Sequence, residues 1–329
     1  MKKIKSLLAI LAAFLSINLS AQPKLILDTD FGMDADDLGA LAMLHHFVDH
    51  ERCELLAIMS WSTEQYAVSA IDAVNQYYGH PNIPIGTRKG QTSFEAWHYN
   101  KPLVDRFHHE LDYVQAPDAT FLYRKILSQS DNKSITIVTI GPLLNIKNLL
   151  ESPADSISDL TGKELVNQKV KEFVVMGGQF PEGTNEWNFD GEMPGVTQAV
   201  IPNIEVPIVF SGFELGLNVL TGKRFNKLDH NTPLYIGFMH FSQHAPWIKE
   251  NFEGQILDNS SYDQTAVLYA VKKGIGHYWN KIEGGVCVAD STGGNKWVKQ
   301  SKSNHAYLKL TMDEQQLARE IEAIMLGQF

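Results

Sequence analysis

The chain has 329 residues and a formal net charge of −10 at pH 7. This length suits one large α/β domain or two small ones, and it can bury a sufficient core without disulfides. The acidic charge argues against nucleic-acid binding, because phosphate contacts need Lys and Arg side chains. The two cysteines, Cys53 and Cys287, could form a single pair, which is no disulfide framework.

The first 21 residues have the order of a secretory signal peptide. A basic start, MKKIK, precedes the apolar stretch SLLAILAAFLSINLS, and Ala21 offers a small residue at a cleavage point. The apolar run is short for a bilayer span, so a membrane anchor is the less favoured alternative. We therefore predict export to the periplasm or the extracellular space. Residues 22–329 would be the mature domain, without a membrane attachment and with a formal charge of −13 after loss of three lysines.

Short apolar runs alternate with helical patterns from residue 24 onward. Strands are expected at residues 24–30, 53–62, 83–86, 134–141, 171–178 and 207–216. Helices are expected at residues 36–50, 64–79, 120–130, 142–152 and 262–274. This alternation predicts an α/β fold, a single domain with a mostly parallel central sheet flanked by helices. Residues 91–117 and 179–195 are polar, aromatic and irregular, and we expect them to form loops over a site.

Polar residues gather where the predicted strands end, and ligands of such sheets bind beyond the carboxyl ends of the strands. The first strand ends in Asp28 and Asp30, and a later one is followed by Ser211 and Glu214. The strand that ends in MGG leaves room for a ligand against bare backbone. One edge of the sheet should therefore carry carboxylates, hydroxyls and glycines.

The stretch LILDTDFGMDADDLGALAML contains five aspartates, namely Asp28, Asp30, Asp34, Asp36 and Asp37. Helix capping and turn formation would explain two of them. Clustered carboxylates repel one another unless a cation lies between them, and their hard oxygens suit Ca²⁺ or Mg²⁺. The sequence has no cluster of Cys or His residues that would indicate a zinc site. The stretch therefore predicts a site for a hard divalent cation.

The segment DTDFGMDADDLGAL resembles the amino-terminal signature of the inosine–uridine nucleoside hydrolases, an Asp-x-Asp-Pro-Gly-x-Asp-Asp-Ala pattern. Similar segments follow in the family's order: CELLAIMSWSTEQ, AVSAIDAVNQYYGHPNIPI, ITIVTIGPLLNI, FVVMGG, NEWN and YDQTAVLYA. The resemblance covers most of the mature chain and implies a secreted, divergent member. It implies Ca²⁺-dependent hydrolysis of the N-glycosidic bond of ribonucleosides or related ribosides, which releases base and ribose.

The resemblance also implies roles for individual residues. The Ca²⁺ ligands would be Asp30, Asp37, Asp263 and the main-chain carbonyl of Ile140. Asp30 would in addition take a proton from the attacking water, whose pKa the metal lowers.

The substrate would be a small nucleoside or riboside. Asp36 and Asn188 would bind ribose hydroxyls, and Glu186 the 5′-hydroxyl. Trp187, where the family has Phe, or else Trp61, could stack on a base. A homo-oligomer is possible, and the sequence does not decide the base or the sugar.

Several departures from the family pattern leave alternatives open. The signature carries two extra residues, so Asp34 or Asp36 could take the first family Asp position; the helix register favours Asp36. Tyr262 stands where many members have His, and Tyr, with a pKa of about 10, is a weaker acid than His at about 6.5. Tyr262 would then serve leaving groups that need little help, or another acid such as Glu64 would take over.

Two other readings remain. One is a non-catalytic or weakly active relative that binds calcium and a nucleoside or sugar. The other is a phosphatase of the haloacid-dehalogenase type, which also opens with Asp-x-Asp after a strand. The latter is disfavoured because Phe31 and Gly32 follow Asp30, where that class has Gly-Thr.

Overall fold

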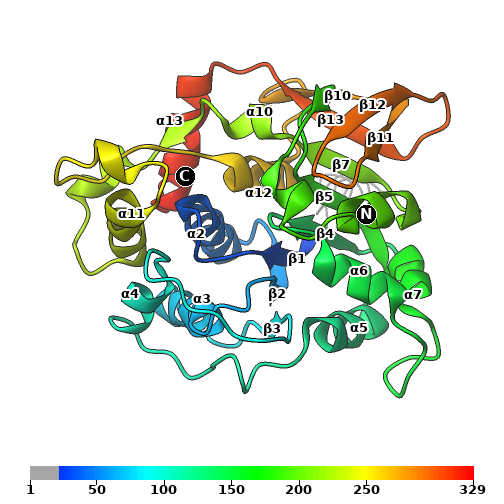
Figure 1. Cartoon of the computed structure of the whole chain (residues 1–329), viewed down its shortest axis with the longest axis horizontal. Helices are drawn as coiled ribbons and strands as arrows, with labels where there is room; N and C mark the ends of the chain where they lie inside the picture. Colours follow the sequence, from blue (N-terminus) through cyan, green and yellow to red (C-terminus); the bar gives the residue numbers. More distant parts are fainter. Residues whose placement is uncertain (1–21) are drawn as a thin grey trace, which may run out of the picture.

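The computed structural model describes residues 22–329, so the predicted signal peptide lies outside the described residues. A central sheet has helices on both faces (Figure 1), and its order is β10-β13-β7-β5-β4-β1-β2-β3. All neighbouring strands are parallel except β10, which is antiparallel to β13. The predicted single-domain α/β fold with a mostly parallel sheet is therefore confirmed. The strands are β1 (Lys24–Thr29), β2 (Glu54–Ser60), β3 (Ile85–Thr87), β4 (Ile135–Thr139), β5 (Val170–Met176), β7 (Ile208–Ser211), β10 (Trp279–Ile282) and β13 (His305–Leu310).

The helices connect these strands and cover the sheet. They are α2 (Ala35–Asp49), α3 (Ala67–Tyr77), α4 (Asn100–Val104), α5 (Ala119–Gln129), α6 (Leu144–Glu151), α7 (Gly162–Lys169), α8 (Trp187–Asp190), α9 (Val196–Val200), α10 (Phe213–Gly216), α11 (Pro233–His244), α12 (Tyr262–Lys272) and α13 (Glu314–Met325). Within residues 22–329, none of them combines the length and apolarity that a bilayer span requires.

Strand β1 shows how the apolar runs produce two cores. Leu25 and Leu27 face one cluster, which α2, α12 and α13 cover, whereas Ile26 faces the other, covered by α5, α6 and α7. Because both faces of the sheet are buried, its strands read as continuous apolar runs rather than as alternating ones. Cys53 and Cys287 lie in separate clusters, and both are free and buried, so the possible disulfide does not form.

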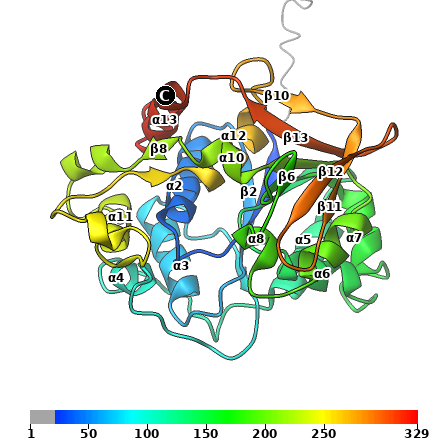
Figure 2. The same ribbon diagram turned by 45° about the horizontal axis from the view of Figure 1, so that its top comes forward.

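Two small sheets stand outside the central one. One has the order β11-β12-β6, formed by Gly285–Ala289, Asn295–Lys299 and Glu182–Gly183, and the other pairs β8 (Leu220–Thr221) with β9 (Asn259–Ser260). Figure 2 shows the first of them beside α8. The predicted strand 207–216 is shorter than expected, because β7 ends at Ser211 and the short helix α10 follows Gly212.

Candidate active site

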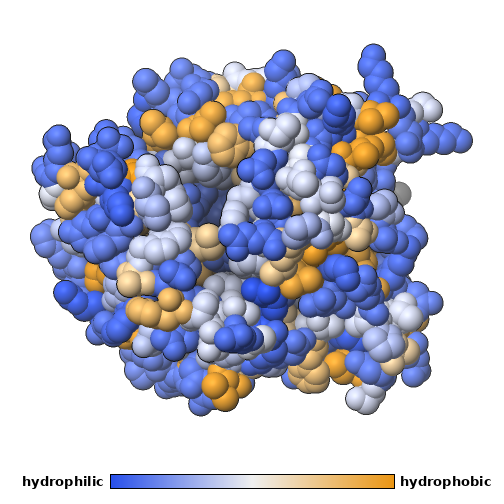
Figure 3. Space-filling model, viewed as in Figure 1, coloured by the Kyte–Doolittle hydropathy of each residue, from blue (hydrophilic) through white to orange (hydrophobic). Residues whose placement is uncertain are grey.

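A cavity of about 600 Å³ opens at the carboxyl ends of β1, β4 and β5, and Figure 3 shows a hollow near the centre of this face. All nine residues to which the sequence analysis gives a primary role line this cavity. They are Asp30, Asp36, Asp37, Ile140, Glu186, Trp187, Asn188, Tyr262 and Asp263. The fold therefore brings together residues that are far apart in the sequence. Their individual roles stay predictions.

Asp30 follows β1 directly and lies against the backbone that follows β4. A Cβ atom at Gly141 would lie 2.7 Å from the Asp30 nitrogen and 2.9 Å from its Oδ1, so only glycine permits this approach. The indole Nε1 of Trp187 donates to Oδ2 of Asp30 at 2.9 Å. Burial raises the pKa of Asp30 to about 6, and the Trp187 hydrogen bond acts against this rise.

Asp28 belongs to a different environment, although it is only two residues away. It does not line the cavity; its carboxylate accepts hydrogen bonds from the Tyr123 hydroxyl at 2.8 Å and from Asn145 Nδ2 at 3.2 Å. These partners come from α5 and α6, on the face of the sheet that Ile26 also occupies. The expectation that Asp28 joins the site is therefore wrong: Asp28 shares the face of Ile26, two residues before it, whereas Asp30 follows Thr29, the last residue of β1, and no longer obeys the alternation of the strand.

The start of α2 carries the next carboxylates. Asp34 caps the helix, accepting the main-chain N–H of Asp36 at 3.5 Å and a hydrogen bond from Asn259. Asp36 and Asp37 then fall in the first helical turn and are buried. Asp36 and Asp37 are thus the adjacent pair at the start of the helix, and the preference for Asp36 over Asp34 in the first family position stays a prediction.

Asp36 and Asp37 meet Asp263 from the first turn of α12. The Asp36 carboxylate accepts the main-chain N–H of Asp263 at 3.3 Å, and Asp37 accepts a hydrogen bond from the Thr29 hydroxyl. The three residues can each place one carboxylate oxygen within 4.8 Å of the others. We call them the carboxylate triad. Asp30 is not a member of it, so the structure groups Asp36 with Asp37 and Asp263 where the resemblance implies Asp30.

The triad has no positively charged partner among the lining residues that the structure describes. Burial, and after it repulsion between neighbouring carboxylates, raises the pKa values of Asp36, Asp37 and Asp263 well above the ordinary range. No Lys, Arg or His lines the cavity in the part of the chain that the structure describes. An all-oxygen set of buried carboxylates fits a hard divalent cation such as the implied Ca²⁺.

Helix α8 forms one wall, and Glu186 is its N-cap. The Glu186 carboxylate accepts main-chain N–H groups of Gly178 at 2.7 Å and of Asn188 and Phe189 at 3.1 Å each. Burial raises the pKa of Glu186 to about 7, and these three hydrogen bonds act against the rise. Asn188 Nδ2 donates to the Met176 carbonyl at 3.3 Å, so the wall is fastened to the end of β5.

The backbone on both sides of α8 is strained. Asn185 and Glu192 have φ values of 55° and 52°, a region that residues with a Cβ rarely adopt. Both residues line the cavity. The main-chain hydrogen bond from Glu186 to the Gly293 carbonyl, 3.0 Å long, ties this segment to the turn before β12. Strain of this kind collects at functional sites, where the surrounding structure has to impose it.

Aromatic rings surround the mouth of the cavity. Trp187 and Trp247 are 38% and 55% exposed, and Trp247 meets Trp97 edge to face with ring centroids 5.4 Å apart. Phe213 stacks on Tyr262 at 4.8 Å. Trp97, Phe213 and Trp247 were not among the predicted site residues. Trp97 lies in the loop 91–117, which the sequence did place over a site, whereas Trp247 follows a helix that the sequence analysis missed.

Two alternative residues lie elsewhere. Trp61 does not line the cavity, and the Arg88 guanidinium lies 4.4 Å from its ring centroid. Glu64 is buried away from the cavity, where it accepts hydrogen bonds from Asn100 Nδ2 at 2.9 Å and from the Tyr66 N–H at 3.0 Å. Neither the stacking role of Trp61 nor the acid role of Glu64 is compatible with these positions.

Tyr262, in contrast, does reach the cavity. Burial raises the pKa of its hydroxyl to about 12. As a phenol with a raised pKa, it holds its proton more tightly than an ordinary tyrosine does.

Comparison with known proteins identifies a family whose sequence pattern the chain matches and solved structures that share its fold. A family model described as "Inosine-uridine preferring nucleoside hydrolase" matches residues 25–319. None of the curated proteins compared with the chain matches it.

Several solved structures are similar to the chain. A plant nucleoside hydrolase, PpNRh1, has a TM-score of 0.65 and 15% identity, with 92% of this chain and 98% of that chain covered. An inosine-guanosine nucleoside hydrolase has a TM-score of 0.60 and 16% identity, with coverages of 93% and 99%. The type III effector protein XopQ, solved with adenosine diphosphate ribose, has a TM-score of 0.65 and 12% identity, with coverages of 97% and 96%. At such identities the likeness supports the fold alone.

Proposed function

The chain belongs to the inosine-uridine preferring nucleoside hydrolase family, and on this premise we propose that it is a Ca²⁺-dependent hydrolase of the N-glycosidic bond in ribonucleosides or related ribosides. The observation that carries the proposal is the carboxylate triad at the floor of the cavity, with Asp30 beside it and no basic side chain among the described lining residues. Such a floor can hold a cation and a sugar together.

The cation would be held by Asp37 and Asp263, by the Ile140 carbonyl, and by Asp30 or Asp36. When bound, the metal would lower the pKa of a water molecule and orient the sugar hydroxyls. Asp30 would accept the proton of that water. The Trp187 N–H holds one of its oxygens, and the other lies close to Gly141, which follows β4.

The walls would bind the ribose. Asp36, a member of the triad, and Asn188 offer polar groups, and Glu186 offers a carboxylate that three main-chain N–H groups hold in one orientation. A fixed sugar brings C1′ and the water together and removes much of the entropic barrier to reaction. Carboxylates around the ring also favour the positive charge that the sugar develops in the transition state.

A second candidate is a protein that binds a nucleoside or nucleotide and hydrolyses it weakly or not at all. Two observations favour it: Tyr262 occupies the position of the usual His, and XopQ has been solved with adenosine diphosphate ribose.

We also propose that the chain is exported with cleavage after Ala21. Amino-terminal sequencing of protein from its native host would test this, and a mature start at Met1 would refute it.

Turnover separates the two candidates. The chain without residues 1–21 is mixed with p-nitrophenyl riboside, inosine or uridine, with calcium or with a chelator. We expect release of nitrophenol that depends on calcium and a much slower release of base from inosine. The Tyr262→Phe variant should cleave the nitrophenyl substrate at the parental rate. Calorimetric binding of ribose without any turnover would favour the second candidate instead.

A further inference from the structure

We propose that the cavity selects ribosides whose base is an aromatic cation in the intact substrate, of which an N-ribosylpyridinium ion is the simplest example. This inference names the substrate class and rests on the proposed function. It is based on the aromatic mouth and on the charge of the whole cavity lining.

Aromatic rings from separate parts of the chain line the cavity. Trp187 belongs to α8, Phe213 to α10 and Tyr262 to α12, whereas Trp97 and Trp247 come from loops next to α4 and α11. The buried carboxylates bind the sugar end of a riboside at the floor. The leaving group must then lie toward the mouth, among these rings, whose electron-rich faces attract cations.

Electrostatics favours the same kind of ligand. Seven carboxyl side chains line the cavity, and they are those of Asp30, Asp34, Asp36, Asp37, Glu186, Glu192 and Asp263. A divalent cation at the floor would offset two negative charges, and no described lining residue supplies another positive one. The remaining field attracts a cationic ligand and repels a phosphorylated one. The cavity should therefore bind adenosine diphosphate ribose poorly.

The reaction of such a substrate also fits the groups that are present. When the C1′–N bond breaks, its electron pair stays on the ring nitrogen, and the positively charged pyridinium leaves as a neutral pyridine. Water forms the new bond to C1′ and gives its proton to Asp30. The leaving group needs no proton, and the described lining contains no imidazole or ammonium group that would supply one. A purine or pyrimidine would instead leave as an anion unless it were protonated.

The test compares kcat/KM for nicotinamide riboside, p-nitrophenyl riboside and inosine in the presence of calcium. We expect nicotinamide riboside to exceed inosine by at least about a hundredfold, the scale that general acid catalysis contributes when it is available. Cleavage of the nitrophenyl substrate with no preference for nicotinamide riboside over inosine would overturn this inference and leave the proposed function intact. Failure to cleave any riboside would refute the proposed function.

Binding tests the selectivity without turnover. Calorimetry with ribose present compares the N-methylnicotinamide cation with neutral nicotinamide, and we expect the cation to bind at least tenfold more tightly. Equal binding would overturn the proposal even if no riboside were cleaved.

Variants of Trp247 test whether the aromatic residues at the mouth cause the preference for nicotinamide riboside. Trp247→Ala should lower kcat/KM for nicotinamide riboside about tenfold, whereas Trp247→Phe keeps an aromatic face and should retain most of it. Phe94→Ala is the matched control, because Phe94 is 48% exposed in the loop 91–117 but does not line the cavity. An equal loss in Trp247→Ala and Phe94→Ala would contradict the assignment.

Discussion

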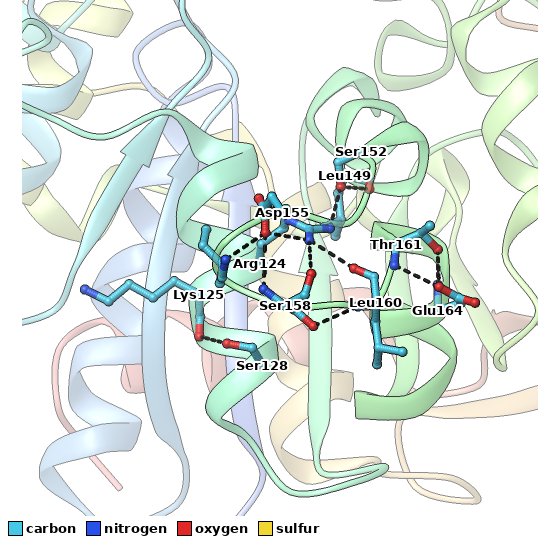
Figure 4. Close-up of polar contacts among 11 residues, drawn as sticks. Arg124, Lys125, Ser128, Leu149, Ser152, Asp155, Ser158, Leu160, Thr161 and Glu164 are labelled. Atoms are coloured by element: carbon cyan, nitrogen blue, oxygen red, sulfur yellow. Dashed lines mark hydrogen bonds and ion pairs between the residues drawn. The ribbon is translucent and has the colours of Figure 1, made fainter.

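The protein buries ionisable side chains in two regions. In one region they have oppositely charged partners, and in the other the described part of the chain supplies none. On α5, the Arg124 side chain is only 2% exposed and is surrounded by its own acceptors (Figure 4). Its Nε and Nη2 donate to the two oxygens of Asp155 at 2.9 and 2.8 Å, and Nη1 donates to the Ser152 hydroxyl at 3.0 Å. Nη2 also donates to the carbonyls of Ser158 and Leu160. We call this the Arg124 network.

The carboxylate triad has no such partners. Its members accept hydrogen bonds from Thr29 and from main-chain N–H groups, but in the described chain no cationic side chain faces them in the cavity. A buried charge normally requires a partner, because removal from water costs several kcal/mol per ion. The comparison shows that Arg124 has its partners within the protein, whereas the triad has room for a cation that the protein does not supply.

The largest expected effect follows from removing the proposed proton acceptor, Asp30. Asp30→Asn keeps the shape and the Trp187 contact but cannot take a proton from water. We expect kcat for p-nitrophenyl riboside to fall by roughly two to four orders of magnitude. The matched control is Asp105→Asn, at an exposed aspartate on the surface. Unchanged circular dichroism in both variants would show that the fold is intact, and near-parental turnover by Asp30→Asn would move the base to another carboxylate.

The next effect concerns the ligand that completes the triad. Calcium at about a thousand times its dissociation constant should add about 4 kcal/mol to the free energy of unfolding. Asp37→Ala should abolish this gain and the bound metal, while its metal-free form should be no less stable than the metal-free parent, since one repelling charge is gone. Urea unfolding with and without calcium, together with elemental analysis, measures both. Equal metal content in variant and parent would contradict the assignment.

A similar but purely structural effect is expected in the Arg124 network. Arg124→Ala leaves the Ser158 and Leu160 carbonyls without their donor and should lower the free energy of unfolding by about 3 kcal/mol. Lys125→Ala is the control, because Lys125 is the next residue on α5 and points away into solvent (Figure 4). The kcat of Arg124→Ala should remain parental at temperatures where it is folded. A loss of activity without a loss of stability would show that the two regions are coupled.

The smallest expected effect is a dependence of the free energy of unfolding on pH. The Arg124 hydrogen bonds lower the pKa of Asp155 from its ordinary 3.8 to about 2 in the folded protein. Because the folded pKa is the lower one, this contribution to stability is present above pH 4 and disappears as the pH falls toward 2. Urea unfolding of the parent and of Asp155→Asn should therefore differ at pH 6, and the difference should shrink below pH 4. A constant difference would show that the charge of Asp155 is not involved.

The sequence predicts the central part of the molecule well, because there local pattern and tertiary structure agree. The apolar run before Asp30 and the helical period after Asp37 place both residues at the edge of a parallel sheet. Asp28 shows the limit of that reasoning: it belongs to the same motif as Asp30, yet it lies inside β1 and faces Tyr123, whereas Asp30 lies after the strand has ended. The strand period does not predict this difference, because residues two apart in a strand lie on the same face.

The walls of the cavity were harder to predict, because their segments have no regular pattern. Helix α8 spans only Trp187–Asp190, and Glu186 caps it by contacts that require the Gly178 turn to be in place. Trp247 comes to the mouth only because α11 packs beside α2. The amphipathic helix Glu314–Met325 had a readable period and could have been predicted, whereas the short strands β10 to β12 depend on pairing with distant segments.

The contact between Gly141 and Asp30 affects how the results of a mutational scan of this protein should be interpreted. Position 141 carries no reactive atom, yet any side chain there would push into the Asp30 nitrogen and carboxylate. A complete substitution library should therefore show nearly the same intolerance at 141 as at 30, even for Gly141→Ala. Ranking positions by tolerance alone would place Gly141 beside the proposed proton acceptor, and only the geometry shows that Gly141 acts by making room for Asp30.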